Sequence, residues 1–187
     1  AMEGMARNHA ILGTSEACIA TYPGDLAVAL VAFDAEIHTT ERSIPVEDFF
    51  LLPGDTPDRE TVLEPGEVIT RISLPASRTA RTSTYLKVRD RQSYEFAAAS
   101  AAVGVTLQAD GRTIEDVRVA LGGVATRPWR SRSVEDALRG QPLEEDVIVA
   151  ASRLCVDDAV AHDGNKYKID LAPRVVARAI LQAGGLA

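Results

Sequence analysis

Small, hydroxyl-bearing and thiol side chains cluster between residues 8 and 25, and residues of these types could hold a polar ligand. A turn at Gly13-Thr14-Ser15 precedes a short apolar segment that contains Cys18. A second turn ends at Asp25, a favourable helix N-cap, and the apolar run Leu26–Ala32 consists of strong helix formers. The sequence therefore predicts a buried helix that begins beside this loop.

The chemistry that such a loop offers is binding. Backbone N–H groups and the positive end of the helix dipole would face a close-packed polar ligand, and the alternative is a buried turn and helix without a ligand. The same N–H groups would favour a thiolate at Cys18, and here the alternative is a small buried thiol beside the ligand. A serine nucleophile is not expected, because Glu16 and Ala17 break the Gly-x-Ser-x-Gly pattern. The sequence also has no P-loop or dinucleotide-binding Gly-x-Gly-x-x-Gly motif.

Composition and charge narrow the class of protein. The 187 residues are 46% hydrophobic and 25% charged, as in ordinary globular proteins, and can form one domain or two small ones. The net charge of −7, without a basic cluster, argues against nucleic acid or an anionic membrane as a partner. No apolar run approaches the roughly 20 residues that a membrane helix needs, and the first residues do not resemble a secretion signal.

Cysteine and histidine usage points to a reducing compartment and to no metal. Cys18 and Cys155 lie far apart in the sequence, so no disulfide framework is predicted and a cytoplasmic location is expected. These two cysteines and the three histidines, His9, His38 and His162, show no metal-ligand spacing.

Hydrophobic spacing predicts the elements of the first part of the chain. Residues 35–39 alternate apolar and polar side chains, as a half-buried strand does, and residues 44–50 predict an extended entry at a proline followed by a short helical turn. Residues 67–75 predict a strand that is stopped by a proline. Residues 76–81 are small and basic, so a domain boundary or a long hairpin is expected there.

The second part predicts a sheet and helices. Residues 82–89 form a strand with Leu86 and Val88 on one face and Tyr85, Lys87 and Arg89 on the other. Residues 97–108 predict a central strand, with an Ala-rich helix as the alternative, and an Asp-Gly turn returns the chain antiparallel over 113–121. Helices predicted over 133–140, 144–161 and 168–183 pack on each other and on one face of this sheet.

Four segments resemble the flavin-binding medium subunit of the molybdenum hydroxylases, a group that includes xanthine dehydrogenase, bacterial aldehyde oxidoreductase and carbon monoxide dehydrogenase. In the family's order they are HAILGTSEACIATYPGDLAVALVAFDAEI, IPVEDFF, LEPGEVITRISLP and YLKVRDRQSYEFAAASAAVGV, which cover nearly the whole chain. The aldehyde-oxidoreductase type is the most similar. The family's N-terminal half, whose Gly-Gly loop holds the FAD pyrophosphate, has no counterpart in these residues. The cysteines of an iron–sulfur insertion, found in some aldehyde-oxidoreductase relatives, are also absent.

The resemblance implies an α+β fold in two units. Residues 1–76 resemble the second subdomain of a two-part FAD-binding domain. Residues 77–187 resemble the medium subunit's C-terminal domain, a small antiparallel sheet packed against a helical bundle.

The resemblance also implies roles for individual residues. Asp25 falls at the aspartate that binds the ribityl chain of FAD, with helix capping as its alternative role. Ile69 falls where an aliphatic residue packs against the flavin, and a place in a strand core is its alternative. Lys87 falls at a lysine near the isoalloxazine ring, where a cation would stabilise the reduced flavin, and the alternative is an exposed strand lysine. Tyr94, in a polar loop, could cover one face of the flavin. The loop that lines the same cofactor contains Thr14, Ser15, Cys18, Ala20 and Thr21.

The function implied is that of an FAD-containing electron-transfer component. Iron–sulfur clusters would pass electrons to the flavin and then to an acceptor, after a molybdenum subunit oxidises an aldehyde or a purine-like substrate. The implied partners are an iron–sulfur small subunit, a molybdenum-cofactor large subunit and the N-terminal half of the FAD domain, and export with such partners makes the periplasm the alternative location. The isolated chain is expected to be inactive and to bind FAD weakly or not at all. The alternative is a structural or docking fragment that does not bind FAD by itself.

Overall fold

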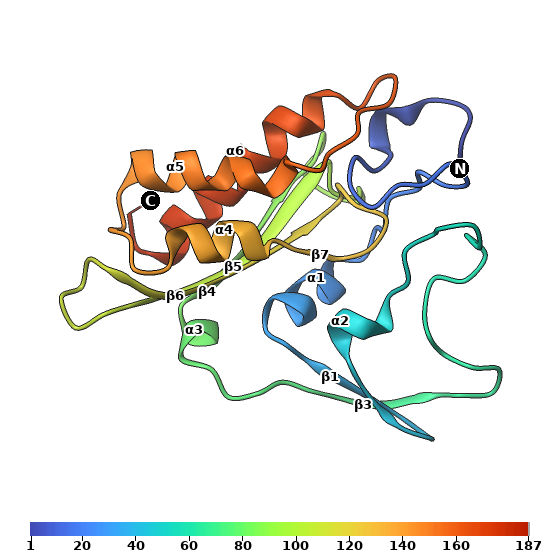
Figure 1. Cartoon of the computed structure of the whole chain (residues 1–187), viewed down its shortest axis with the longest axis horizontal. Helices are drawn as coiled ribbons and strands as arrows, with labels where there is room; N and C mark the ends of the chain where they lie inside the picture. Colours follow the sequence, from blue (N-terminus) through green and yellow to red (C-terminus); the bar gives the residue numbers. More distant parts are fainter. Residues whose placement is uncertain (187) are drawn as a thin grey trace.

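Two antiparallel sheets organise the computed structural model, which describes residues 1–186 (Figure 1). The smaller sheet has the strand order β2-β1-β3, and the larger has the order β4-β5-β6-β7. Their strands are β1 (Glu36–Thr39), β2 (Ser43–Pro45), β3 (Ile69–Ser73), β4 (Ser83–Val88), β5 (Ala99–Leu107), β6 (Ile114–Gly122) and β7 (Trp129–Arg130).

Most of the helical residues follow the second sheet in the sequence. Its long hairpin, β5 and β6, is followed by α4 and α5 and by the longest helix, α6. The helices are the 3-10 helix η1 (Ala6–Asn8), α1 (Asp25–Ala32), α2 (Val46–Phe49), α3 (Arg78–Arg81), α4 (Arg132–Leu138), α5 (Glu145–Ser152), the 3-10 helix η2 (Arg153–Val156) and α6 (Tyr167–Ala183). The predicted helical layer on one face of the sheet is confirmed, because α6 packs on β4 and β5 and α4 packs on β6.

The four-stranded sheet is covered on both faces, with α4 to α6 on one side and α1 on the other (Figure 1). On β5, Val103 and Val105 belong to the core under α6, whereas Ala102 belongs to the core under α1. Small residues allow α1 to approach closely, since a Cβ at Gly122 would meet Val28 of α1 at 2.6 Å. The Ala-rich segment is therefore the predicted central strand and not a helix, because its small side chains fit between two helical layers.

The three-stranded sheet buries one side only. Ile37 pairs with Ile44 of β2 and with Ile72 of β3, and the first two are buried with α1 and α2. Ile69 and Ile72 of β3 each remain 41% exposed. The predicted strands over 35–39 and 67–75 and the short helical turn after Pro45 are confirmed.

The start of α1 corrects one prediction. Gly24 is the N-cap, and Asp25 is the first helical residue without a side-chain capping bond. Five residues of the helix are buried: Ala27, Val28, Leu30, Val31 and Ala32. Leu26 is 68% exposed, so one face of the helix is open to solvent although the helix was predicted to be buried.

Two short elements and the end of one helix differ from the predictions. The short helix α3 occupies the segment expected to be a boundary or hairpin, and β7 was not predicted. The helix expected over 144–161 ends at Ser152 and tightens into η2. The α3 turn is fixed by Thr79, a buried residue whose hydroxyl lies 3.0 Å from that of Thr106 and donates to Asp116 at 2.8 Å.

The N-terminal segment belongs to the core of the larger sheet. Ile11 and Leu12 are buried against β5, β6 and α6, and Leu12 pairs with Ala125 in a parallel bridge. The proposed division at residue 76 falls between β3 and α3 and stays a prediction, since the two parts share both hydrophobic cores.

Candidate functional site

An open cleft of about 450 Å³ lies where three segments of the chain meet. These segments are the N-terminal stretch up to α1, the loop between β4 and β5, and the turn after β6. The lining residues are Asn8, His9, Ala20, Thr21, Pro23, Asp90, Tyr94, Glu95, Phe96, Ala97, Ala98 and Gly123. Its lining exposes more apolar than polar surface, although six of the twelve lining residues are polar or charged, and its volume is within the range of about 300–1,000 Å³ that is typical of small-molecule sites.

One glycine shapes the cleft. Gly123 has a φ of +72°, and a Cβ there would meet the carbonyl oxygen of Ala97 at 2.6 Å. Both residues line the cleft. The turn after β6 can therefore approach the backbone at Ala97 this closely only with glycine at position 123.

An ion pair and a tyrosine stand at the first residue of α1. The carboxylate of Asp25 accepts hydrogen bonds from Lys87 Nζ at 2.7 Å and from the Tyr85 hydroxyl at 2.8 Å, while Ser100 Oγ lies 3.0 Å from the same hydroxyl. Burial raises the pKa of Tyr85 above its ordinary value, so this tyrosine remains a neutral donor. Neither Asp25 nor Lys87 lines the cleft, and the lining residue nearest to the ion pair in the sequence is Pro23, two residues before Asp25.

Ser15 and Thr21 hold the loop that leads to the cleft. Ser15 Oγ donates to the carbonyl of Gly54 at 2.8 Å and accepts the N–H groups of Ala17 and Cys18. Thr21 Oγ1 donates to the carbonyl of Asn8 at 2.7 Å. Of the predicted loop residues, Ala20 and Thr21 line the cleft, while Thr14 is half-buried elsewhere in the loop.

Cys18 lies on the other side of this loop. It borders a small pocket of about 50 Å³, which Ala20 and Thr21 also line. Burial acts to raise the pKa of its thiol, but hydrogen bonds to the sulfur, the first from the Ala20 N–H, outweigh burial and hold the pKa below its ordinary value.

Two predicted site residues are surface residues. Tyr94 lines the cleft, is 94% exposed and has a φ of +53°. Its loop is held by Arg91, whose N–H donates to the Glu95 carboxylate at 2.8 Å and whose guanidinium donates to the Tyr94 carbonyl. Ile69 belongs to β3 and does not line the cleft, and its exposure rules out the strand-core role that was its alternative.

A buried cation, Lys168, lies behind the cleft and was not predicted from the sequence. Lys168 is fully buried, and its Nζ donates to the carbonyls of Asn8 at 3.1 Å and Gly123 at 2.6 Å. Burial lowers the pKa of Lys168 to about 8. The spacing of α6 contained the signal, because Lys168 stands one turn before Ala172 and two before Val176, on the buried stripe of the helix.

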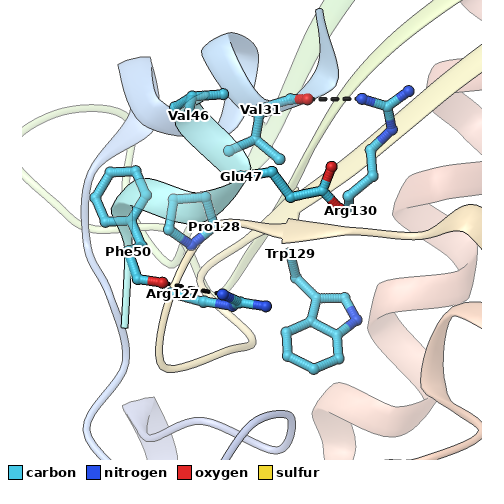
Figure 2. Close-up of a pocket in the computed structure, with 8 residues that line it drawn as sticks. All are labelled: Val31, Val46, Glu47, Phe50, Arg127, Pro128, Trp129 and Arg130. Atoms are coloured by element: carbon cyan, nitrogen blue, oxygen red, sulfur yellow. Dashed lines mark hydrogen bonds between the residues drawn. The ribbon is translucent and has the colours of Figure 1, made fainter. Parts of the chain in front are cut away.

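A second, smaller pocket of about 70 Å³ separates α1, α2 and β7 (Figure 2). Arg130 Nη1 donates to the carbonyl of Val31 at 2.7 Å, and Arg127 Nη1 donates to that of Phe50 at 2.9 Å. The Arg130 guanidinium also binds the buried carboxylate of Glu135. These arginines tie the sheet to both helices, so this pocket is a packing gap at a structural joint and the larger cleft is the candidate site.

Residues 1–186 contain neither a metal-binding group nor a membrane-spanning helix. No group of three or more His, Cys, Asp or Glu side chains in this range is placed to hold a metal ion. No helix within it is long and apolar enough to cross a membrane.

Two family models match the chain on either side of α3. Residues 4–77 match the FAD binding domain in molybdopterin dehydrogenase, and residues 83–183 match the CO dehydrogenase flavoprotein C-terminal domain. The two models describe consecutive parts of a flavoprotein, an FAD-binding domain of molybdopterin dehydrogenases and a flavoprotein C-terminal domain. More narrowly, the chain belongs to the family of FAD-binding medium subunits of the molybdenum hydroxylases, which confirms the resemblance found in its sequence segments.

Relatives by sequence come from aldehyde and carbon monoxide enzymes. The aldehyde oxidoreductase FAD-binding subunit PaoB of Escherichia coli is 41% identical over 98% of this chain and 55% of its own length. The carbon monoxide dehydrogenase medium chain of Hydrogenophaga pseudoflava is 27% identical over 85% of this chain and 56% of its own length. The chain thus spans about half the length of these relatives.

Solved structures confirm the α+β fold. Carbon monoxide dehydrogenase from Hydrogenophaga pseudoflava, in a form that lacks the Mo-pyranopterin moiety, matches with a TM-score of 0.72 and 27% identity over 88% of this chain and 60% of that one. Quinoline 2-oxidoreductase from Pseudomonas putida 86 matches with a TM-score of 0.72 over 97% of this chain and 60% of that one, and at 22% identity it supports the fold alone.

Proposed function

We propose that this chain holds the flavin and ribityl part of FAD in the cleft, as part of an electron-transfer subunit of a molybdenum-dependent oxidoreductase. The main support for the proposal is the Asp25–Lys87 pair at the start of α1, two residues after Pro23, which lines the cleft. The two residues were expected at a flavin site from different parts of the sequence, and Lys87 Nζ lies 2.7 Å from the Asp25 carboxylate.

The residues present fit the flavin part of the cofactor. The cleft exposes more apolar than polar surface to a flat ring, Asp25 supplies an acceptor for ribityl hydroxyl groups, and Lys87 supplies a cation for the reduced ring. Tyr94 lies at the exposed side of the cleft, where its ring could cover one face of the flavin. The remaining proposed contacts are Thr14, Ser15, Cys18, Ala20 and Thr21 on the loop, and Ile69 as an exposed apolar side chain on β3.

The cofactor, when bound, accepts electrons and passes them on, while the protein binds it, orients it and sets its electrostatic environment. In this proposal an iron–sulfur small subunit delivers the electrons, a molybdenum-cofactor large subunit oxidises an aldehyde or purine-like substrate, and the chain works inside that complex.

The affinity of the 187-residue chain for FAD is proposed to be low. The proposal rests on the sequence resemblance, in which the Gly-Gly loop that holds the FAD pyrophosphate has no counterpart among these 187 residues. Charge-assisted hydrogen bonds are worth about 1.5–3 kcal/mol each, so several missing contacts to the diphosphate weaken binding by orders of magnitude.

Flavin titrations test both parts of the proposal. We expect FAD fluorescence to change only at micromolar or higher protein concentration, and FAD, FMN and riboflavin to bind within about tenfold of each other, because the proposed contacts are to the shared flavin and ribityl groups. Submicromolar FAD binding that FMN does not match would contradict the proposed division of contacts. If none of the three binds at millimolar concentration, the chain is a structural or docking module.

A further inference from the structure

The start of α6 lies directly behind the cleft. Lys168 is in the first turn of this helix, is fully buried, and donates from Nζ to the carbonyls of Asn8 and Gly123 at 3.1 and 2.6 Å. Asn8 and Gly123 both line the cleft, although one belongs to the N-terminal segment and the other follows β6. One ammonium group therefore joins two cleft segments that lie far apart in the sequence.

Asn165, one turn earlier, continues the same set of contacts. Its side chain is buried, and Nδ2 donates to the carbonyl of Ala10 at 3.1 Å and that of His9 at 3.4 Å, while Oδ1 accepts the N–H of His162 at 2.7 Å. The orientation of the amide is thus fixed by three backbone groups.

Tyr167 reaches the third segment of the cleft through an arginine. Its hydroxyl donates to the carbonyl of Arg7 at 3.1 Å, and the Arg7 guanidinium lies over its ring, 4.8 Å from the centroid. The same guanidinium contacts both carboxylate oxygens of Asp90 at 2.9 Å, and Asp90 lines the cleft in the loop after β4. Side chains from 165 to 168 thus hold four consecutive carbonyls, those of residues 7 to 10.

We propose that Asn165, Tyr167 and Lys168 form a clasp that positions all three segments of the cleft from behind. The clasp residues are positioning residues, since Asn165 and Lys168 are buried behind the cleft and none of the three lines it. The effect of the clasp on flavin binding rests on the proposed function, whereas its effect on the cleft backbone does not.

A lysine is a costly choice for packing alone. An apolar side chain of similar length would fill the same space without desolvating a charge, so the two carbonyl contacts are what the lysine adds. The charged and titratable groups that act on it electrostatically are Arg7 and His9. A neutral amine still carries two N–H donors, so both carbonyl contacts can survive loss of the charge.

Lys168→Met tests the clasp, with Val176→Ala as the matched control. Methionine keeps the length and removes both donors, while Val176 is a fully buried apolar residue of the same helix and does not line the cleft. Hydrogen exchange is measured at Ile11 and Leu12, whose N–H groups bond to the carbonyl of Val124. We expect Lys168→Met to speed exchange there by about tenfold more than in β5, and Val176→Ala to change both regions alike.

Tyr167→Phe is a milder second variant, since it removes only the hydroxyl that donates to Arg7. It should speed exchange in residues 7–12 by a smaller factor and leave β5 unchanged. Riboflavin affinity, measured on the same samples, should fall for Lys168→Met and match the parent for Val176→Ala. If exchange in residues 7–12 and 123–126 is the same in Lys168→Met as in the control, the clasp is refuted whether or not flavin binds. If exchange rises locally while the parent binds no flavin, the clasp stands and the proposed function fails.

Discussion

The two sheets of this protein are stabilised in different ways. In the four-stranded sheet, eight consecutive residues of β5 are buried, because helices cover both faces. In the three-stranded sheet, four of the five residues of β3 are exposed. The four-stranded sheet carries Lys87, leads into the turn at Gly123 and packs against the helix that begins at Asp25, so the candidate site is built on the better-packed sheet.

Polar contacts replace apolar packing in the smaller sheet. Glu67 accepts hydrogen bonds from Arg42, at 3.0 and 3.1 Å, and from the Thr39 hydroxyl at 2.6 Å, which ties the end of β1 to the turn before β3. These bonds, the arginine first, hold the pKa of Glu67 at about 2. His38 lies 2.7 Å from both Ser43 and Ser73, on the two outer strands. The backbone of β4, which carries Lys87, is therefore held by apolar packing. The backbone of β3, which carries Ile69, is held by polar contacts that depend on pH.

The largest expected effect is in the core of the larger sheet. Ile180→Ala removes a fully buried side chain of α6 and should lower the free energy of unfolding by about 2–5 kcal/mol. Ile72→Ala on β3 is the matched change at a 41% exposed position and should cost about 1 kcal/mol or less. Urea denaturation followed by circular dichroism measures both, and equal losses would show that the two sheets do not differ as described.

Variants of the ion pair test whether the packed sheet positions cofactor contacts. Asp25→Asn should change stability by only about 0–1 kcal/mol, because its carboxylate is 46% exposed. In the reconstituted enzyme it should reduce FAD content, because the carboxylate that accepts ribityl hydroxyl groups is lost. Lys87→Met keeps the length but not the charge and should lower the flavin midpoint potential, since a cation favours the more negative reduced form. If flavin content and potential both match the parent enzyme, these two assignments are wrong.

The sequence predicted which side chains share a face of a strand, but not which polar groups they meet. Alternation predicted that Leu86 and Val88 share one face of β4 and that Lys87 lies on the other. In the structure Leu86 and Val88 pack in the core under the helices, and Lys87 meets Asp25 at the start of α1. The local pattern predicted Asp25 as a helix cap, and the family resemblance predicted it as a ribityl contact. Neither prediction included its bonds to Lys87 and Tyr85. The residues around Asp25 in the sequence would be the same whether its carboxylate capped the helix or bonded to Lys87 and Tyr85.

Contacts between distant segments account for most of the other errors. The turn α3 depends on Thr79 bonding to Thr106 and Asp116, which lie on other strands. Lys168 was placed in a structural helix, and only the tertiary structure shows that its donors meet carbonyls more than 40 residues away in the sequence. Local periodicity predicts which face of an element is buried, and it carries no information about which polar groups meet there.

Acid should affect the smaller sheet selectively. Glu67 has a pKa of about 2 in the folded protein and 4.5 ordinarily, so its contribution to stability is present above about pH 4.5 and is lost as the pH falls toward 2. Hydrogen exchange should therefore show β1 and β3 losing protection between pH 4.5 and 2.5 earlier than β5 and β6. In Glu67→Gln the protection of β1 and β3 should already be weaker at pH 6. It should then fall less between pH 4.5 and 2.5 than it does in the parent protein. Simultaneous loss in both sheets would contradict a separate polar hold on the smaller one.

The smallest expected change in stability comes from a matched pair of β3 variants, and it tests whether this sheet reaches the cofactor. Ile69 and Ile72 are both 41% exposed on the same strand, so Ile69→Thr and Ile72→Thr should each change the free energy of unfolding by about 0.5 kcal/mol or less, since threonine is also β-branched. If Ile69 packs against the flavin, only Ile69→Thr should weaken riboflavin binding, because it replaces an apolar contact surface with a hydroxyl. Equal affinity in both variants would remove Ile69 from the site and leave flavin contacts to the four-stranded sheet and its loops.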